Sequence, residues 1–578
     1  MIYYKTNFEA SPDLARKDRV MTVAMPLQRA TAEPLLTVLN PVGFPPRVNE
    51  KDLAPRLEGL DGKTIYLVDS RFDDSAELLK QVVAWFADKM PGVTTKLVSL
   101  SGYYGRDDPA LWDEIRANGH AAIIGVGHCS TCAPAVSTHA ITLETKYGVP
   151  TVAIHTDKFD RVVRSVTRMG GLPNAATVFV PQPVMGRSAA ELRAYVDGID
   201  PVSGVPVMQE VIDGLTKGLP APASASAAIP HTTPRLLDPA SEEDLHELFL
   251  ANNWTDKLPI ILPTEERVAA MLAGTSRQPD EVVGRLQPTP NRGLWEFTVE
   301  KVAVNAVMAG ARPEYFPVIL ALAASGSTAR GSTSSSGAAM VVVNGPIRHQ
   351  IGMNAGIGAM GPYNHANATI GRAYGLLSQN LQGGSVPGET FMGSLGNAYS
   401  YNSVTFAENE ERSPWEPLHV QKGFDPEDSV VSIFFGCRST TFNLGLREKF
   451  WREQVADMLR GTDVVGPPVL LLDPIAARQF VERGGFDTKD ALLDFVHDAA
   501  LVPAAQYWDH QLVQNYIYPN ATLGVEPLAT RLKAAPDELI PMFRRDTLNV
   551  VVVGGESNGY WQIMGAGYRT SVKIDDWR

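Results

Sequence analysis

The chain has 578 residues, too long for one hydrophobic core, because single cores stop growing at about 250–300 residues. We therefore expect two large structural units, or three of ordinary size. The formal net charge of −13, with no cluster of Lys and Arg, argues against a nucleic acid or an anionic membrane as the partner.

The compartment is inferred from segments that the sequence lacks. The opening residues have no apolar core of a signal peptide, and no stretch approaches the roughly 18 apolar residues of a membrane span. Three cysteines cannot form a disulfide framework. We expect a cytoplasmic protein in a reducing compartment, whose cysteines serve chemistry rather than cross-linking.

One stretch, residues 218–230, has the composition of a linker, with small residues, three prolines and no apolar period. It predicts a first domain over residues 1–217, a linker over 218–237 and a second domain over 238–578. The second domain is long enough to form two lobes.

The first domain alternates predicted strands with predicted helices. Apolar and β-branched runs predict strands at 65–68, 94–100, 121–126, 150–154 and 176–180. Helical patterns cover 75–89, 109–118 and 133–147, the last with Pro134 in its first turn and Gly148 as its stop. The continuous apolar run 121–126 is typical of a strand buried on both faces. This order predicts an α/β domain with a doubly wound parallel sheet.

The second domain has a less regular pattern. Amphipathic helices are expected over 242–252 and 264–274, and a long apolar segment over 297–322 is broken by Arg312-Pro313. Residues 325–396 are rich in Gly, Ser, Asn and Ala, and buried strands are expected at 430–435, 469–472 and 548–553. We expect a larger domain of mixed α/β structure.

The pair Cys129-Ser130-Thr131-Cys132 stands where a predicted parallel strand ends and a helix begins. Open α/β sheets bind ligands at this edge, and Gly125 and Gly127 allow backbone to approach a ligand closely. Free amides and the positive end of a helix dipole lower the pKa of a thiol there. The spacing lets Cys129 attack and Cys132 resolve through a short disulfide.

Two other interpretations of this pair stay open. A metal site with His128 would need further ligands, and no second CxxC or HxxxH is present. An inert pair of buried thiols is also consistent, because free cysteine is among the most buried residue types. His139 lies about 10.5 Å along the helix from Cys132, which favours a core or surface histidine. His155, after the next strand, is the better polar neighbour.

Residues 125–157 resemble the UGSC-type proteins, named for a selenocysteine-Gly-Ser-Cys motif whose first position is cysteine in many members. More distantly they resemble the substrate-binding B component of glycine reductase. With the stretches 39–43 and 60–69, the likeness covers about residues 35–200. It implies reductive cleavage or covalent capture of a small molecule, with Cys129 at the selenocysteine position and Cys132 at its cysteine partner.

Two positions depart from the family pattern. Ser130-Thr131 stand where the motif has Gly-Ser, and residues 181–183 read Pro-Gln-Pro where a His-Pro pair is expected in relatives. The second domain resembles uncharacterised bacterial proteins associated with UGSC-type partners, in the stretches 343–346, 361–373, 406–410 and 413–417. This likeness implies a fusion of two proteins usually made separately, which favours joint action at one site.

Two carboxylates in the second domain, Glu408 and Glu410, follow an apolar run. If the chain is extended there, both project to one face. Paired carboxylates can share a proton, act as acid and base, or hold a hard cation. Trp415 would form an apolar wall that raises one pKa. A solvated acidic turn is the alternative.

Other polar residues lie in the Gly-rich region, where backbone can approach a ligand. Asn344 belongs to a turn, Asn367 supplies an amide, and His365 is a candidate for acid–base work. The tract 332–337 predicts either an anion-binding nest or a flexible loop. Cys437, beside Arg438, is either an activated nucleophile or a small core residue.

We therefore predict an enzyme, an oxidoreductase or lyase, that cleaves a carbon–heteroatom bond of a small organic molecule held between the domains. Cys129 would be the nucleophile and Cys132 the resolving thiol, with proton transfer by Glu408, Glu410 or His365. The predicted binding residues are Gly127, His128, Ser130, Thr131, His155, Asn344, Asn367 and Trp415. No metal or resident cofactor is predicted, an external thiol or dithiol would be the reductant, and a homo-oligomer is compatible with the sequence.

Two other functional classes stay open at this point. One is a hydrolase or acyl transferase that uses a cysteine nucleophile without net redox chemistry. The other is a metal-carrying or redox-sensing binding protein that shows no turnover.

Overall fold

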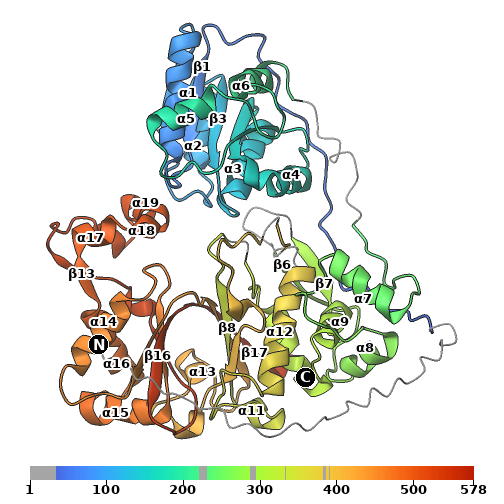
Figure 1. The fold of residues 1–578 in the computed structure, drawn as a ribbon, viewed down its shortest axis with the longest axis vertical. Coiled ribbons are helices and arrows are strands. Elements are labelled where there is room, and N and C mark those ends of the chain that lie inside the picture. Colours follow the sequence, from blue (N-terminus) through green and yellow to red (C-terminus); the bar gives the residue numbers. More distant parts are fainter. Residues whose placement is uncertain (1–33, 220–230, 287–293, 332–333, 382–385, 389–390) are drawn as a thin grey trace, which may run out of the picture.

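The computed structural model describes residues 34–219, 231–286, 294–331, 334–381, 386–388 and 391–578. Figure 1 shows a parallel-sheet domain in blue to teal and a larger second domain in green to red. Most of the predicted linker, residues 220–230, lies outside the described residues. The fold class is α/β, as predicted.

The first sheet has five parallel strands in the order β2-β1-β3-β4-β5. They are β1 (Thr64–Asp69), β2 (Thr94–Ser99), β3 (Ala121–Gly127), β4 (Thr151–Thr156) and β5 (Ala176–Val180). Strand β3 is buried along its whole length, because apolar clusters cover both faces of the sheet. The predicted doubly wound parallel sheet is confirmed.

Six helices cover this sheet: α1 (Ser75–Lys89), α2 (Pro109–Asn118), α3 (Cys132–Thr142), α4 (Asp160–Met169), α5 (Ala189–Val196) and α6 (Val207–Thr216). Helices α1, α5 and α6 pack on one face, and α2, α3 and α4 on the other. The helix predicted over 133–147 begins at Cys132 and continues into a π-helical turn, Leu143–Tyr147. Gly148, with φ +68°, ends it as predicted.

The second domain contains two four-stranded mixed sheets, ordered β17-β10-β8-β9 and β11-β16-β12-β15. The first consists of β8 (Ala338–Asn344), β9 (Val404–Ala407), β10 (Val430–Gly436) and β17 (Gly567–Lys573). The second consists of β11 (Thr440–Leu444), β12 (Pro468–Leu472), β15 (Asn549–Val552) and β16 (Tyr560–Gly565). The predicted mixed α/β structure is confirmed.

These two sheets pack face to face between two layers of helices. We call the β17-β10-β8-β9 sheet and its helices the first lobe, and the other sheet and its helices the second lobe. Val341 and Val343 on β8 face the helices of the first lobe, whereas Met340 and Val342 share a core with Leu471 of the second sheet. The alternation follows from the two-residue repeat of a strand. The outer helices are α7 (Glu242–Ala251), α8 (Glu265–Leu272), α9 (Val299–Met308), α10 (Phe316–Ala324) and α12 (His365–Asn380) for the first lobe, and α14 (Trp451–Arg460), α15 (Pro474–Gly484) and α16 (Lys489–Ala499) for the second.

Side-chain caps set several of these helix starts. Ser241, Thr264 and Thr488 each accept a hydrogen bond from a backbone N–H in the first turn of α7, α8 and α16. Such caps satisfy amides that have no acceptor within the helix. The sequence therefore marks these boundaries locally.

The first described residues belong to the second domain rather than to the parallel sheet. Leu36 and Val38 form β-bridges with Ala240 and Thr264, and Val38 is buried in the core of the first lobe. The Lys301 ammonium donates to the backbone oxygen of Asn40 (2.7 Å). The chain thus crosses from the second domain into the first, and later returns.

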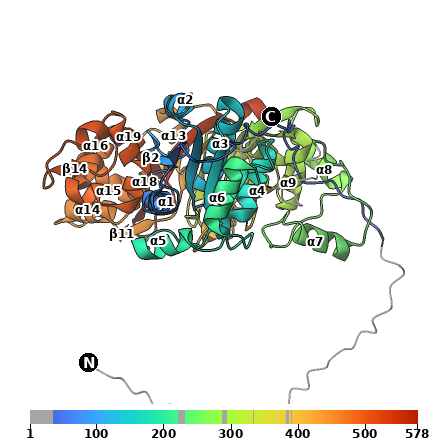
Figure 2. The same ribbon diagram turned by 90° about the horizontal axis from the view of Figure 1, so that it is seen from above.

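The loop edge of the parallel sheet faces the second domain (Figure 1; Figure 2 gives the view from above), and side chains of the two domains are in contact there. Asn515, on α18 (Gln511–Tyr516), accepts from the backbone N–H of Asp73 (3.2 Å) and donates to its carboxylate (2.8 Å). The ring of Tyr516 packs edge-on against Phe72. None of the helices in the described part of the chain is long and apolar enough to cross a membrane.

Candidate functional site

The Cys129–Cys132 loop joins the end of β3 to the first turn of α3. Strand β3 lies beside β1, and the connections from these two strands leave in opposite directions along the sheet. This is the topological switch point, where open α/β sheets leave a crevice for ligands. The structure therefore places the cysteines where the sequence predicts them.

The two thiols have different environments. Helix α3 begins at Cys132, so the backbone N–H of that residue has no acceptor within the helix. It donates to the Cys129 sulfur instead (2.9 Å). The Thr131 hydroxyl lies 3.4 Å from the same sulfur. Burial acts to raise the pKa of Cys129, but the hydrogen bonds from Cys132 and Thr131 outweigh it, so the pKa lies below its ordinary value.

The Cys132 thiol has the opposite shift. It is fully buried, and its sulfur lies 3.7 Å from the carbonyl oxygen of Cys129. Burial and the neighbouring Cys129 raise the pKa of Cys132 well above its ordinary value. Cys129 is therefore the more acidic thiol of the pair, and Cys132 the less acidic one.

Two tyrosines that the sequence analysis missed stand beside this loop. The Tyr104 hydroxyl is hydrogen-bonded to the Thr131 hydroxyl (2.8 Å), and the rings of Tyr104 and Tyr516 are in edge-on contact. Burial raises the pKa of both tyrosines, and the nearby Cys129 raises it further, so both stay neutral hydroxyls. Tyr104 follows the strand β2 at the same sheet edge, a position that strand prediction could have found. Tyr516 belongs to the second domain, and nothing local marks it.

The histidines near the loop are buried and neutral. His128 contacts the carbonyl oxygen of Phe72 (3.0 Å), and His139 contacts that of Tyr104 (2.8 Å). Burial lowers the pKa of both, and it lowers the pKa of His155 to about 3. Among the described residues, none of these imidazoles hydrogen-bonds to either thiol.

His155 instead supports the base of the loop. Its ring packs so closely on Gly127 that a Cβ added there would stand 2.2 Å from Nδ1. Its Nε2 lies 3.3 Å from the hydroxyl of Ser137, on α3. Gly127 is thus required by this close approach, and His155 acts as a positioning residue for the strand end.

A segment of the second domain covers the loop. The Ser334 hydroxyl accepts from the backbone N–H of Ser130 (3.2 Å) and lies 3.3 Å from its hydroxyl. The backbone N–H of Ser394 donates to the carbonyl oxygen of Ser334 (2.8 Å). Met392 packs against the apolar cluster around Phe159. Part of the predicted Ser-rich tract, residues 332–333, lies outside the described residues.

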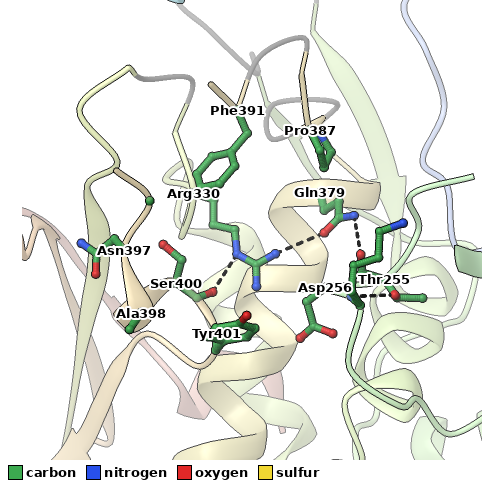
Figure 3. Close-up of a pocket in the computed structure, with 12 residues that line it drawn as sticks. Thr255, Asp256, Arg330, Gln379, Pro387, Phe391, Asn397, Ala398, Ser400 and Tyr401 are labelled. Atoms are coloured by element: carbon green, nitrogen blue, oxygen red, sulfur yellow. Dashed lines mark hydrogen bonds between the residues drawn. The ribbon is translucent and has the colours of Figure 1, made fainter. Parts of the chain in front are cut away.

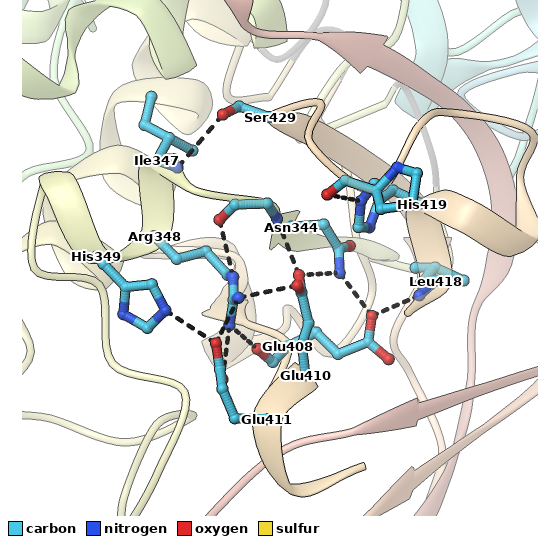
Figure 4. Close-up of polar contacts among 12 residues, drawn as sticks. Asn344, Ile347, Arg348, His349, Glu408, Glu410, Glu411, Leu418, His419 and Ser429 are labelled. Atoms are coloured by element: carbon cyan, nitrogen blue, oxygen red, sulfur yellow. Dashed lines mark hydrogen bonds and ion pairs between the residues drawn. The ribbon is translucent and has the colours of Figure 1, made fainter. Parts of the chain in front are cut away.

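Glu408 and Glu410 are brought together, but both are fully engaged (Figure 4). Asn344 donates from one amide nitrogen to both carboxylates, at 2.6 and 2.9 Å. Completely buried, Glu408 also accepts from the Lys489 ammonium (3.1 Å) and from the backbone N–H of Leu418 (2.6 Å). A solvated acidic turn does not account for that burial.

The second carboxylate, Glu410, is paired with a buried guanidinium. Arg348 lies 2.8 Å from one oxygen of Glu410, and the backbone N–H of Gly345 donates to the other (2.8 Å). Together with Glu408 and Lys489, these contacts join the ends of β8 and β9 to helix α16. The geometry is that of a buried cross-link between the lobes of the second domain.

Other predicted residues of the second domain lie in its framework. The Nδ1 of His365 is 3.3 Å from the Tyr315 hydroxyl, and Asn367 is hydrogen-bonded to the backbone of Asn354 in both directions. The Trp415 indole donates to the carbonyl oxygen of Phe486 within the second-lobe core. Within the described residues, no hydrogen bond or ion pair joins these side chains, or those of Glu408 and Glu410, to the cysteine loop.

The third cysteine is a core residue. Cys437 is completely buried, and burial raises the pKa of its thiol to about 12. A thiol with that pKa is protonated at neutral pH and is a poor nucleophile. Across the described part of the chain, no three His, Cys, Asp or Glu side chains are grouped so that they could hold a metal ion.

Comparison with known proteins identifies one part of the chain. Residues 37–203 match the model of the UGSC family, which confirms the predicted resemblance for this part. The matched range contains the whole five-stranded sheet and both cysteines of the loop. No curated protein and no solved structure matches the chain.

The unequal thiols predict unequal pH profiles. We expect Cys129 to be alkylated with a midpoint below the ordinary thiol pKa of about 8.5, and Cys132 only at higher pH. Thr131→Val should raise the Cys129 midpoint by about one pH unit, because it removes a donor to the thiolate. Mass spectrometry of protein alkylated between pH 5 and 9 measures both midpoints. Thr142→Val, farther along the same helix, is the matched control, and identical profiles for Cys129 and Cys132 would contradict the assignment.

The carboxylate network predicts a large loss of stability when the cation paired with Glu408 is removed. Lys489→Met should destabilise the protein by about 3–5 kcal/mol, because it leaves Glu408 buried without its cation. The exposed pair of Arg460 with Asp457 provides the control, since Arg460→Met should cost about 1 kcal/mol or less. Urea unfolding followed by tryptophan fluorescence compares the two variants. Equal midpoints would show that the buried pair is not a cross-link.

Proposed function

We propose that this chain is a thiol-dependent enzyme that reductively cleaves a carbon–heteroatom bond of a small organic molecule. The observation that carries the proposal is the hydrogen bond from the Cys132 N–H to the Cys129 sulfur (2.9 Å). It stabilises a thiolate at Cys129, while Cys132 three residues later holds a proton. A nucleophile and a resolving thiol are the two groups that such chemistry needs.

In the first step, the Cys129 thiolate attacks the substrate carbon. A carbon–sulfur bond forms, the carbon–heteroatom bond breaks, and the heteroatom leaves with the bonding electron pair and takes up a proton. The Thr131 hydroxyl lies 3.4 Å from the attacking sulfur and is hydrogen-bonded to the neutral hydroxyl of Tyr104, and both hydroxyls are suited to donate to the leaving group.

In the second step, Cys132 resolves the adduct. Its pKa is raised in part by the negative charge of Cys129, and that charge disappears once Cys129 is alkylated. Deprotonated Cys132 then attacks the Cys129 sulfur, so a disulfide forms and the carbon–sulfur bond breaks. The carbon leaves with the electron pair and is protonated. An external thiol or dithiol supplies the two electrons that reduce the disulfide.

The chemistry restricts the substrate. A carbon that departs with an electron pair needs a neighbouring group that accepts the charge, such as a carbonyl. The positive end of the α3 dipole lies at this crevice and favours developing negative charge there. We therefore propose carbonyl compounds with a heteroatom on the adjacent carbon as the substrate class.

Substitution of each cysteine separates this proposal from its alternatives. With excess dithiothreitol and a panel of α-substituted carbonyl compounds, the unaltered protein should catalytically convert at least one compound of the panel. Cys129→Ser should lower the rate by about three orders of magnitude or more, because no nucleophile remains. Cys132→Ser should stop after one equivalent, with the substrate carbon retained on Cys129, as detected by mass spectrometry. Cys437→Ser is the matched control and should leave turnover unchanged.

The remaining outcomes point elsewhere. Full turnover by Cys132→Ser would indicate a hydrolase or acyl transferase with a cysteine nucleophile. A reversible disulfide without turnover of any compound would indicate a redox-sensing binding protein. Either result would overturn the reductive mechanism.

A further inference from the structure

A cavity of about 460 Å³ lies in the first lobe of the second domain, apart from the cysteine loop (Figure 3). Segments that are distant in sequence form its walls, including Thr255–Lys257 near α7, the end of α12 and residues 396–401. Its volume is within the range of small-molecule sites. The proposed function assigns it no ligand.

The floor of this cavity presents a buried guanidinium, that of Arg330, which is only 7% exposed. Its Nε donates to the carbonyl oxygen of Ser400 (2.8 Å), and Nη1 donates to the side-chain oxygen of Gln379 (3.1 Å). Both acceptors are neutral. Among the described residues, no carboxylate lies within ion-pair distance of Arg330, and its Nη2 has no hydrogen-bond acceptor.

Among the described lining residues, the one carboxylate is already neutralised. Asp256 is bound by both ends of the Arg372 guanidinium, with each contact at 2.9 Å. A further cation, Lys257, donates to the carbonyl oxygen of Leu250 and to the side chain of Asn253, which are again neutral. The cavity is therefore positively charged, and burying a guanidinium without a counter-charge is costly.

Other parts of the lining are apolar or aromatic. Phe391 and Pro387 line it, and Tyr401 lies below the guanidinium (Figure 3). Helix α12 approaches the guanidinium through Gly375, where an added Cβ would stand 2.7 Å from the Arg330 Nη2. A cation and an aromatic ring in one cavity match a ligand with an anionic end and an apolar body.

We propose that this cavity binds a small organic carboxylate, with the carboxylate on Arg330 and an alkyl or aryl group against Phe391. A planar carboxylate suits the guanidinium, because the same group accepts a hydrogen bond from Nη2 and supplies the negative counter-charge that Arg330 lacks. The site is a second one, and its binding does not require Cys129.

Calorimetric titration of the full chain tests the proposal with acetate, butyrate, benzoate and 3-phenylpropionate, each against its matched primary amide. At least one acid should bind with a stoichiometry of one, more tightly than its amide. Arg330→Gln should weaken that binding by about 10- to 100-fold, because it removes a charged hydrogen-bond donor. Cys129→Ser should bind with unaltered affinity, which separates this site from the thiol chemistry.

A second variant keeps the test decisive if Arg330→Gln fails to fold. Gly375→Ala retains the charge but displaces the end of the Arg330 side chain, and it should also weaken binding. Arg438→Met, which removes a surface guanidinium paired with Asp463, is the matched control and should leave binding unchanged. The proposal would be overturned if acid and amide bound equally, or if none of the four acids bound. It would also be overturned if both Gly375→Ala and Arg330→Gln bound the acid as tightly as the unaltered protein.

Discussion

The hydrogen bond from the Cys132 N–H to the Cys129 sulfur is the constraint on which the thiol site depends. It exists because α3 begins at Cys132, and the first amides of a helix have no acceptor within it. The groups that lower the Cys129 pKa are hydrogen-bond donors of the loop itself, and none of them is a cationic side chain. Of the two middle residues of the loop, only Thr131 contributes a hydroxyl to the Cys129 sulfur, because the Ser130 hydroxyl lies against Ser334 instead. This explains why Ser130-Thr131 can stand where the family motif has Gly-Ser.

The position of that loop depends in turn on the path of the chain. Residues 36–44 are paired with the second domain before the chain enters the parallel sheet, and the match to the UGSC family begins within this segment, at residue 37. The first domain is therefore tethered to the second at both of its ends. Ser334 and Tyr516 of the second domain reach the loop region through this arrangement. The tethering holds the cysteine loop against the second domain.

The local features were predictable, and the long-range ones were not. Strand β3, the start of α3 and the cysteine loop follow from an apolar run, a proline and a glycine stop within 30 residues. The buried state of Glu408 depends on Lys489, 81 residues later, and its surroundings in sequence are hydrophilic. Tyr516 and Arg330 belong to no periodic pattern that points to their sites. Pairings of this kind are set by how the lobes pack, which residue spacing does not encode.

One short segment takes part in both candidate sites of the molecule. Phe391 and Asn397 line the cavity around Arg330, while Ser394, between them, holds the carbonyl of Ser334 against the cysteine loop. The same seven residues, 391–397, therefore contact both the cavity and the segment that covers the cysteine loop. This shared segment ties the two candidate sites together more directly than the proximity of the two domains alone.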